Sequence, residues 1–585
     1  MKLIENDIKR CAIFLFYDKD GIVDDYVINL LECLKKSVDD ILVVCNGIIP
    51  EESQLKFRTV TQDILIRDNA GFDVGGYREG LFYYGFEKLQ RYDEIVMLNY
   101  TFFGPLYPFE EMFDEMSKRD IDFWGITGHF SVNPDPYGQN RYGYMPKHIQ
   151  SHFLVLRRSL FMSSEYKDFI INMRNPRSYV ESICDYESIF RKYFEDLGFE
   201  GDTYCDEEEY EGYVYNPVMF RLKDMIVSKR CPIIKRRSFF TDYQDFMLNS
   251  CGETTAEVYD YLKENDLYNL DYIWDNLLRL ENMSEISRAM QLKYMLSDEE
   301  CEREHIKEHK IAVVVYVQSA KNAIEYESCL SQIDEQISCV FVGEETELNK
   351  IKEIPTISTR DFEYRIINGA AYSCIMCEIL NGIREKYEYV GILEMKDCEQ
   401  EQPYSNAVSW QYSDWKNILA SKEYINNVIQ TFEDNKRMGM LIPPIPNFGT
   451  VFANAQDGWF GKFENVKHFL EEKNVRVSIK REDEPLSPIG GSFWLSTKVL
   501  ENNKLDVNSL LGIEDEKSVL LTIPFLVQNA GYYIGTAYNM DYASIAVTNS
   551  DYRMRELNKT VFEKYGPSYH TIVVDRIKKN EFEVK

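Results

Sequence analysis

Short apolar runs alternate with helical stretches and polar turns along the first 240 residues. Residues 12–17, 41–45 and 95–98 are continuous apolar runs, and 65–66 is a shorter one. Runs of this length predict strands that are buried on both faces of a sheet. A helical pattern over 23–36 separates the first two runs. Because helices separate the strands, the chain predicts an α/β fold with a mainly parallel sheet and right-handed crossovers.

Polar side chains follow the ends of these predicted strands. Asp18 and Asn46 begin the turns after the first two, Asn69 and Asp73 lie in a glycine-rich turn after the third, and Asn99 follows the fourth. Ligands of open α/β sheets bind beyond the carboxyl ends of the strands. We therefore expect a binding site at this edge. Asp18 and Asn46 are also ordinary turn residues, so a purely structural role for both stays open.

Two longer amphipathic stretches predict helices over 77–89, directly after the glycine-rich turn, and over 178–198, which Gly198 ends. Between them, 121–127 predicts a further strand. The loop 131–147 is rich in Pro, Gly, Asn and Tyr. We interpret it as a flap on the side of the site where an acceptor would enter.

The segment from His148 to His152 reads HIQSH and leads into the apolar run 153–156. It has the two-histidine spacing of a zinc-peptidase helix, but it lacks the glutamate that such an enzyme needs as a base. In a strand, His148, Gln150 and His152 would share one face. We therefore expect a polar strand edge that lines a binding site, not a metalloprotease.

A second series of apolar runs begins at 311–317 and continues at 339–342 and 389–393. Residues 241–310 before it are highly charged with helical spacing and predict a helical connector. The order of strands and helices in the second half mirrors the first, which predicts two copies of one α/β unit. The expected division is a first domain over 1–240, a connector over 241–310 and a second, divergent domain over 311–585.

Composition narrows the possible partners. The formal net charge of −31 repels nucleic acid and anionic lipid, so we expect no nucleic-acid binding. One segment, 226–240, has no acidic residue and carries five cations: Lys229, Arg230, Lys235, Arg236 and Arg237. This run is a candidate contact with the inner membrane surface. A solvated basic loop is the alternative.

Other sequence features bear on compartment and cofactor. The thirteen cysteines do not form a disulfide framework or a zinc ribbon pattern, which favours a reducing cytoplasm. The first ten residues lack an apolar signal core, and no run of about 18 apolar residues could span a bilayer. There is no G-x-G-x-x-G and no Walker-type loop. A bound nucleotide would therefore not be held as in dehydrogenases or P-loop enzymes.

Three segments together resemble the rhamnan synthesis protein F family: Asn69-x-Gly71-x-Asp73-x-Gly75-x-Tyr77, the strand end LNYTFFGPL and the run DFWGIT at 122–127. A looser resemblance covers the second half, including GGSFW at 490–494. The resemblance implies two GT-A-like (Rossmann-like) domains and a glycosyltransferase. Its expected reaction is inverting transfer of rhamnose from dTDP-L-rhamnose to a lipid-linked cell-wall or capsular polysaccharide, at the cytoplasmic side of the membrane.

The resemblance also implies site residues. In inverting GT-A transferases an acid near the start of a helix is the general base, and the similarity gives Glu187 this position, with Asp185 as the substitute. A helix N-terminal acid that interacts only with the dipole is the alternative. The remaining candidates are Asp18, Asn46, Asn69, Asp73, Asn99 and His129 for the donor, and Arg141, Gln150 and His152, with Lys147, for the acceptor or the diphosphate.

The sequence leaves open whether the predicted transferase depends on a metal ion. GT-A enzymes usually carry an acidic D-x-D-like element for Mg²⁺ or Mn²⁺ after the fourth strand, where this chain has Asn99-Tyr100-Thr101. The second half keeps acids at its equivalent strand end. There Asp397 is a candidate ligand for the ion and Glu514 or Asp515 a candidate base. A decayed copy that binds the acceptor is the alternative.

Two other classes of function stay open. The chain could be a non-catalytic glycan-binding or assembly subunit, in which both groups of acids are structural. A glycoside hydrolase would need two carboxylates about 5–9.5 Å apart across one cleft. The chain predicts parallel α/β units, but not the eight βα repeats of a (βα)₈ barrel, and this argues against a glycoside hydrolase.

Overall fold

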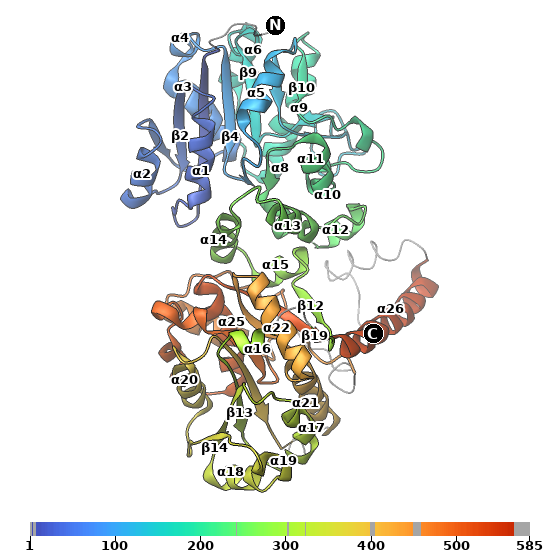
Figure 1. The fold of residues 1–585 in the computed structure, drawn as a ribbon. Coiled ribbons are helices and arrows are strands. Elements are labelled where there is room, and N and C mark those ends of the chain that lie inside the picture. Colours follow the sequence, from blue (N-terminus) through green and yellow to red (C-terminus); the bar gives the residue numbers. More distant parts are fainter. Residues whose placement is uncertain are drawn as a thin grey trace. The chain divides into compact units, whose positions relative to one another are not determined.

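The computed structural model describes residue 3 and residues 8–241, 243–300, 304–321, 323–397, 404–448 and 458–566. The chain divides into two compact units (Figure 1). The first unit comprises Met1–Leu277 with Arg288–Gln291, and the second comprises Leu278–Ser287 with Leu292–Lys585. Among the described residues, no helix is both long and apolar enough to cross a membrane.

The first unit has a seven-stranded sheet in the order β10-β6-β9-β4-β1-β2-β3. Neighbouring strands are parallel except at β9, which is antiparallel to both β4 and β6. The predicted mainly parallel α/β fold is thus confirmed. Its strands are β1 (Arg10–Tyr17), β2 (Asp40–Asn46), β3 (Ile64–Arg67), β4 (Glu94–Asn99), β6 (Phe123–Gly125), β9 (Phe153–Arg157) and β10 (Gly201–Thr203).

Two short antiparallel pairs accompany this sheet: β5 (Phe102–Phe103) with β11 (Ile234–Lys235), and β7 (Gly128–His129) with β8 (His148–Ile149). The helices up to the end of this unit are α1 (Asp25–Leu34), α2 (Glu51–Arg58), α3 (Phe72–Tyr84), α4 (Phe86–Leu89), α5 (Phe109–Ser117), α6 (Arg158–Phe161), α7 (Ser164–Asn172), α8 (Tyr179–Ser182), α9 (Ser188–Glu195), α10 (Pro217–Phe220), α11 (Leu222–Lys229), α12 (Tyr243–Asn249), α13 (Thr255–Glu264) and α14 (Leu270–Leu280).

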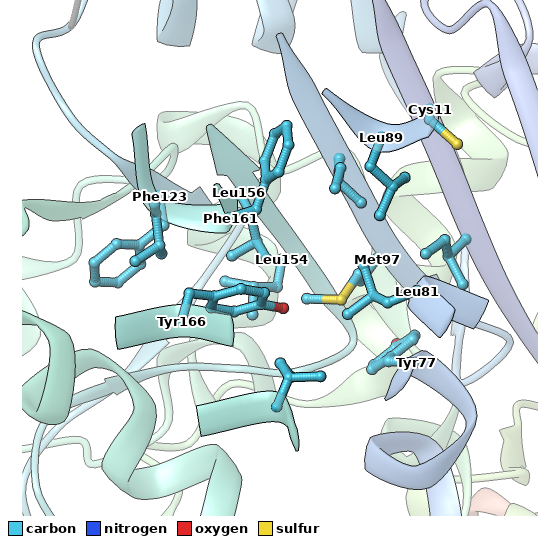
Figure 2. Packing of buried hydrophobic residues seen from close by; sticks show 14 of the residues in the cluster. Cys11, Tyr77, Leu81, Leu89, Met97, Phe123, Leu154, Leu156, Phe161 and Tyr166 are labelled. Carbon is cyan, nitrogen blue, oxygen red and sulfur yellow. The ribbon is translucent and has the colours of Figure 1, made fainter. Parts of the chain in front are cut away.

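The core between the sheet and α3 and α9 is apolar and fully buried. Figure 2 shows part of it, with Tyr77 and Leu81 of α3 beside Met97 of β4. Phe123 of β6 packs edge-on against Phe190 of α9. Because side chains alternate along a strand, Phe16 faces the other side of β1, where its ring meets Phe57 of α2. The continuous apolar runs are explained by burial on both faces.

Helix α3 begins earlier than predicted. The expected turn at 69–76 and helix at 77–89 are wrong in detail, because α3 already starts at Phe72 and a separate short helix, α4, follows it. A Cβ atom on Gly76 would lie 2.3 Å from Leu15 Cδ1, and one on Gly80 would lie 2.5 Å from Ile13 Cγ2. These glycines therefore let α3 pack closely on β1. Gly71, at φ +79°, stands in the turn itself.

The predicted helix over 178–198 is interrupted. α8 leads into a π-helical turn at Ile183–Glu187, and α9 follows directly. π-turns inside α-helices often occur at functional sites. Glu187 closes this turn and lies in the middle of the helical run, not near its start. The turn is thus a natural place to look for chemistry.

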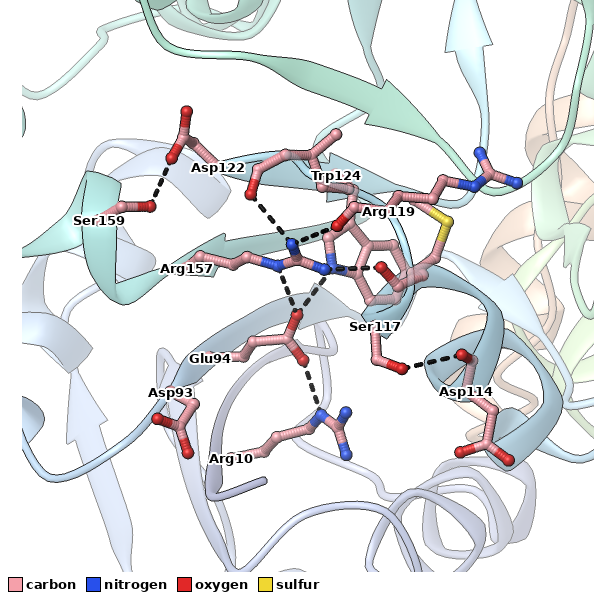
Figure 3. A network of polar contacts seen from close by, with 12 residues as sticks. Arg10, Asp93, Glu94, Asp114, Ser117, Arg119, Asp122, Trp124, Arg157 and Ser159 are labelled. Carbon is pink, nitrogen blue, oxygen red and sulfur yellow. Dashed lines mark hydrogen bonds and ion pairs between the residues drawn. The ribbon is translucent and has the colours of Figure 1, made fainter. Parts of the chain in front are cut away.

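A buried ion network lies at the amino end of β4 (Figure 3). Glu94 accepts from Arg10 Nε at 2.7 Å, from Arg157 Nε at 3.2 Å and from Trp124 Nε1 at 3.1 Å. Arg157 also donates to three backbone carbonyls. Since these four residues come from β1, β4, β6 and β9, the network joins the strands at the edge opposite to the carboxyl ends of β1 and β4.

The second unit has an eight-stranded sheet in the order β12-β19-β17-β18-β16-β13-β14-β15. β18 is its antiparallel strand, in the position that β9 has in the first sheet. Apart from the additional β12, the two strand orders match, as two copies of one α/β unit require. Its strands are β12 (Lys293–Leu296), β13 (Ile311–Val317), β14 (Ser338–Gly343), β15 (Glu363–Ile366), β16 (Tyr389–Met395), β17 (Met438–Ile442), β18 (Phe493–Ser496) and β19 (Tyr533–Asn539).

Strand β12 lies inside the range 241–310, for which the sequence predicts only helices, and it pairs in parallel with β19. The expected domain boundaries at 240 and 310 stay a prediction. The helices from residue 283 onward are α15 (Met283–Ala289), α16 (His305–Glu308), α17 (Glu327–Ser331), α18 (Glu345–Lys352), α19 (Pro355–Ser358), α20 (Tyr372–Ile383), α21 (Tyr404–Ile418), α22 (Lys422–Asp434), α24 (Phe463–Glu472), α25 (Glu516–Asn529) and α26 (Met540–Tyr565).

Candidate functional site

A cluster of polar side chains lies at the carboxyl edge of the first sheet. Its members, which we call the edge cluster, are Asp73, Asn99, Ser151, Glu187 and Lys235. They come from the first turn of α3, the end of β4, the residues before β9, the π-turn and β11. Because β9 runs antiparallel to β4, its beginning lies beside the end of β4, which in turn pairs with β1, so distant segments of the chain converge here.

Ser151 connects the two carboxylates of the edge cluster. Its hydroxyl donates to Asp73 Oδ2 at 3.0 Å, and its backbone N–H donates to Glu187 Oε1 at 2.9 Å. Asp73 also accepts from Ser182 Oγ at 3.3 Å and from Asn99 Nδ2 at 3.5 Å. The two predicted residues Asp73 and Glu187 are therefore brought together on one short hydrogen-bonded chain.

Burial raises the pKa of Asp73, and the nearby negative charge of Glu187 raises it further, while the Ser151 hydroxyl opposes both effects. Two carboxylates that share a site cannot both ionise freely. The Asp73 carboxyl group is therefore more readily protonated than an ordinary aspartate, and in its protonated form it can donate a hydrogen bond.

Lys235 supplies the positive charge of the edge cluster. Its Nζ donates to Thr101 Oγ1 at 3.2 Å, and the Thr101 hydroxyl donates to Asn99 Oδ1 at 2.7 Å. Burial lowers the pKa of Lys235 to about 8, although the negative charges of Glu187 and Asp73 oppose this shift. Lys235 is therefore a cation that a moderate rise in pH above 7 would deprotonate.

The five cations of the predicted membrane patch lie in different surroundings in the structure. Lys229 pairs with Glu209 at 3.0 Å, and Arg230 pairs with Glu111 at 2.6 Å. Arg236 is buried and its Nε donates to Asn276 at 2.7 Å. Lys235 belongs to the edge cluster, and Arg237 is exposed. The run is thus mostly engaged within the first unit.

The predicted donor residues Asp18 and Asn46 hold local turns together. Asp18 Oδ1 accepts from the backbone N–H groups of Asp20 and Ile22 at 2.9 and 3.0 Å. Asn46 Oδ1 accepts from Arg67 Nη1 at 2.6 Å. Both residues lie at the predicted edge, yet these contacts are also those of structural turn residues. Asn69 is exposed in the loop before α3.

The predicted polar strand edge at 148–152 is divided between two strands, because β8 ends at Ile149 and β9 starts at Phe153. His148 stacks on His129 with ring centroids 4.8 Å apart. Burial lowers the pKa of His129 to about 3 and that of His148 to about 4. Burial also lowers the pKa of His152, next to Lys235. All three histidines are therefore neutral near pH 7.

The remaining candidates surround this region. Gln150 is buried and accepts from Thr127 Oγ1 at 2.8 Å. Arg141 is exposed in the loop 131–147, with its guanidinium 5.3 Å from the centre of the Tyr193 ring. Lys147 lies 5.2 Å from the centre of the Phe130 ring. Asp185 is exposed on the π-turn. None of these contacts draws Asp185 or Arg141 into the edge cluster.

The end of β4 does not fit a divalent metal ion. Asn99 Oδ1 already accepts from the N–H and the hydroxyl of Thr101, at 3.1 and 2.7 Å. In the described part of the first unit, no three His, Cys, Asp or Glu side chains lie close enough to share one ion. Mg²⁺ is usually held by one or two carboxylates and by phosphate oxygens. The end of β4 therefore does not supply the ligands of a Mg²⁺ or Mn²⁺ site.

The second unit holds a charged cluster at the equivalent place. Counted from the first residue of β4 and of β16, Glu394 occupies the register position of Asn99. Glu394 is buried and pairs with Lys396 at 2.7 Å, and Lys396 also pairs with Glu516. Burial raises the pKa of Glu394 to about 7, against the attraction of Lys396. The carboxylate that the first unit lacks is present here but is paired with a lysine.

The structure brings together other acids of the second unit than those predicted. Asp515 caps α25, where it accepts from Ser518 N–H at 3.0 Å and Ser518 Oγ at 2.6 Å. Glu514 is exposed, and Asp397 pairs with Lys321 at 3.6 Å. Glu516, which begins α25, is the member of the cluster. The mirrored sequence pattern predicts this helix start, and the roles of Glu514 and Asp515 stay a prediction.

Gly491 lies directly against Glu394. Its φ is +94°, and a Cβ atom there would lie 2.2 Å from the Glu394 carboxyl carbon; Gly461 has φ +74° with nothing within 4 Å. Alanine at either position carries backbone strain of about 1–2 kcal/mol. Only Gly491→Ala must also displace Glu394, which adds about 1–3 kcal/mol. We expect a lower urea midpoint for Gly491→Ala than for Gly461→Ala. Equal midpoints would contradict this packing.

Sequence reasoning missed two members of the edge cluster. Ser151 lies between the two histidines of the HIQSH segment, and one of its two contacts is made by its backbone N–H, which a sequence motif does not reveal. The sequence predicts Lys235 as part of a basic run that contacts the membrane or forms a solvated loop, because clustered basic residues usually lie on the surface. A weak signal was present, since Lys235 follows the apolar pair Ile233-Ile234, which interrupts the basic run. Its pairing with β5 could not be foreseen.

The sequence model of one protein family, described as "Rhamnan synthesis protein F", matches residues 41–516. No curated protein matches the chain. The glycosyltransferase GlyE of Streptococcus pneumoniae TIGR4, in its apo form, is 11% identical over 64% of this chain and 83% of its own, with a TM-score of 0.24. The mannosyltransferase Ktr4p of S. cerevisiae is 8% identical over 32% of this chain and 66% of its own, with a TM-score of 0.22. Because these similarities are so distant, the description of the fold depends on the strand order alone.

Proposed function

Because this chain belongs to the rhamnan synthesis protein F family, we propose that its first unit transfers a sugar from a nucleotide donor to a growing polysaccharide at the edge cluster. Family membership makes the chain a glycosyltransferase of polysaccharide synthesis. The observation that carries the proposal for the site is the convergence of Glu187, Asp73 and Lys235 at the carboxyl edge of the first sheet. It offers a base, a hydrogen-bonding carboxyl group and a cation together.

Glu187 is the proposed general base. As the acceptor oxygen attacks the anomeric carbon, its proton passes to the Glu187 carboxylate. The bond from that carbon to the diphosphate oxygen breaks, and the electron pair leaves with the diphosphate. The Ser151 N–H holds Glu187 Oε1, which orients the other oxygen for the acceptor. Such a positioned base contributes about 10²–10⁴ in rate.

Lys235 is the proposed partner of the leaving diphosphate. It is the one member of the edge cluster that is positively charged, and Thr101 holds its ammonium group at 3.2 Å. A cation in a poorly solvated site stabilises developing negative charge more strongly than it would in water. Asp73, with its raised pKa, is proposed to hydrogen-bond the donor.

Donor affinity should depend on the charge of Lys235. The charged form exists below the pKa of about 8, so affinity should fall as pH rises through 8. A hydrogen bond to a charged group contributes about 1.5–3 kcal/mol, which corresponds to roughly ten- to a hundredfold in affinity. We expect Lys235→Ala to weaken donor binding by this factor and to remove the dependence between pH 7 and 9. Calorimetry at several pH values measures both.

Lys229→Ala is the matched control, because Lys229 belongs to the same basic run but pairs with the half-exposed Glu209. It should leave the affinity and the pH profile as in the wild type. An unchanged profile in Lys235→Ala would remove the lysine from the donor site.

The finer assignments are part of the same proposal. The family description favours rhamnose, hence dTDP-L-rhamnose as donor and inverting transfer. A lipid-linked glycan is the proposed acceptor, reached from the cytoplasmic side, with the exposed Arg237 as the remaining candidate for membrane contact. Any dependence on Mg²⁺ or Mn²⁺ would have to use the phosphates of the donor as further ligands, because the end of β4 supplies no carboxylate.

A second candidate function is supported by one observation. Asn99 stands where a metal-binding carboxylate is expected, and Glu394 of the second unit is paired with Lys396. Both sites could therefore be non-catalytic, in a subunit that binds glycan or assembles a synthesis complex. For the second unit alone, acceptor binding is the role that its ion-paired cluster supports best.

The test is release of nucleoside diphosphate from dTDP-L-rhamnose and from UDP-sugars, measured with and without a membrane lipid extract that carries glycan acceptors. The proposal expects release from one donor, stimulated by the extract. Binding of the glycan without release from any donor would favour the assembly subunit.

A further inference from the structure

The second unit contains a cluster of metal-ligating side chains that the proposed transfer reaction does not use. One ring nitrogen each of His305 and His309 and one carboxylate oxygen of Glu308 lie within 4.8 Å of one another. Among the described residues this is the one such group of three His, Cys, Asp or Glu side chains. It lies on α16 and directly after it.

His305 has a free nitrogen in a fully buried ring. The exposed fraction of the residue is 0%. Its Nε2 lies 2.6 Å from Gln430 Oε1, an atom that can only accept, so Nε2 carries the proton. Nδ1 is then an unprotonated lone pair, and it has no hydrogen-bond partner. A buried polar atom without a partner is destabilising, so its presence calls for a ligand.

His309 is oriented in a similar way. Its Nδ1 lies 3.4 Å from Glu388 Oε1, and Glu388 Oε2 is held by the N–H of Lys310 at 2.9 Å. This is the carboxylate–histidine arrangement that orients metal-ligating imidazoles in proteins. It leaves Nε2 of His309 as the second lone pair. The two rings are nearly parallel, at an interplanar angle of 24°.

We propose that His305, Glu308 and His309 bind a divalent transition-metal ion, with zinc as the best match. Two imidazoles and one carboxylate suit Zn²⁺, Co²⁺ or Ni²⁺, whereas Mg²⁺ and Ca²⁺ prefer oxygen ligands alone. The order H-x-x-E-H also occurs in a class of zinc peptidases. Here α16 ends at Glu308, so His309 lies outside the helix. The proposed role of the three side chains is metal binding alone.

The position of the cluster indicates what the ion would do. α16 lies just before β13, and Glu388 lies just before β16, so the cluster is at the amino ends of these parallel strands. Glu394 is at the other end of β16. Through Glu388 and through Gln430 of α22, the ion would fasten α16 to two further elements. The site is therefore separate from both charged clusters described above and structural in character.

Cysteines are the competing metal ligands of this chain. Cys374 and Cys377 of α20 have the C-x-x-C spacing, but Cys377 is buried, its thiol donates to Val507 O at 3.2 Å, and burial raises its pKa to about 11. This pair does not offer two thiolates. Near-ultraviolet absorption of bound Co²⁺ separates the two cases, because only thiolate ligands give a sulfur-to-cobalt charge-transfer band.

The test is titration of the metal-free full chain with Co²⁺ by absorption and with Zn²⁺ by calorimetry. We expect one ion per chain without a thiolate band. His309→Ala, at a partly buried position, and Glu308→Gln, at an exposed one, should each weaken binding at least tenfold while circular dichroism stays as in the wild type. His468→Ala is the control, because His468 is exposed on α24 and should not change binding.

Three results would overturn the proposal: no binding of either ion, a thiolate band on the bound cobalt, or unchanged affinity in both His309→Ala and Glu308→Gln. Because none of these variants touches the edge cluster, sugar transfer is not needed as a readout, and the result stands apart from the fate of the proposed function.

Discussion

Glu187→Gln should abolish sugar transfer while the protein stays folded. Glutamine keeps a side-chain oxygen for the Ser151 N–H, so the hydrogen bond of 2.9 Å can persist. It cannot accept the proton of the attacking hydroxyl. Removing a positioned general base lowers the rate by about 10²–10⁴. The measurement is the initial rate of transfer at saturating donor, together with the thermal unfolding midpoint, which should not move.

Asp185→Asn is the matched control, because Asp185 belongs to the same π-turn but is exposed. Its rate should be within a small factor of the wild type. If instead Asp185→Asn is inactive and Glu187→Gln is active, the base lies on the other acid of the turn. Full activity of both variants would remove the π-turn from the chemistry.

Glu94→Gln should strongly destabilise the first unit. The substitution removes the charge that two arginines share, at 2.7 Å from Arg10 and 3.2 Å from Arg157, and Arg157 is almost completely buried. Breaking a buried ion pair from one side costs about 3–5 kcal/mol, because the remaining charge is left uncompensated. We expect the urea transition of the first unit to shift accordingly to lower concentration.

Glu111→Gln provides the comparison. It breaks the pair with Arg230, in which both side chains are about half exposed, and surface pairs contribute about 0–1 kcal/mol. A small shift for Glu111→Gln and a large one for Glu94→Gln would show that burial decides the cost. Similar shifts for both variants would contradict the claim that the buried network around Glu94 stabilises the four strands.

The strands were predictable because complete burial on both faces leaves an unmistakable apolar run, as in β1, β2 and β4. The direction of β9 was not, since the run 153–156 reads alike in either orientation. The start of α3 was also missed: Gly75 and Gly76 look like turn residues until the close packing on Leu15 is known. Glycine is ambiguous wherever packing, not backbone conformation, requires it.

The edge cluster was partly predictable from where strands end. Asp73 and Asn99 were found because polar residues after buried strands meet at one edge, and Glu187 because of the family resemblance. Ser151 and Lys235 required the pairing of β9 and β11, which depends on contacts between segments far apart in sequence. His305 and His309 lie in a charged tract whose composition indicates only an exposed helix, while the burial of His305 appears only in the fold.

The most direct test of the central claim is a calorimetric titration of the wild-type chain with dTDP-L-rhamnose and with UDP-sugars, with and without Mg²⁺ or Mn²⁺. The account predicts that one donor binds to one site per chain, and that Glu187→Gln binds it equally well, because this base acts on the acceptor. Absence of binding for every donor, in any metal condition, would contradict a nucleotide-sugar site at the edge cluster.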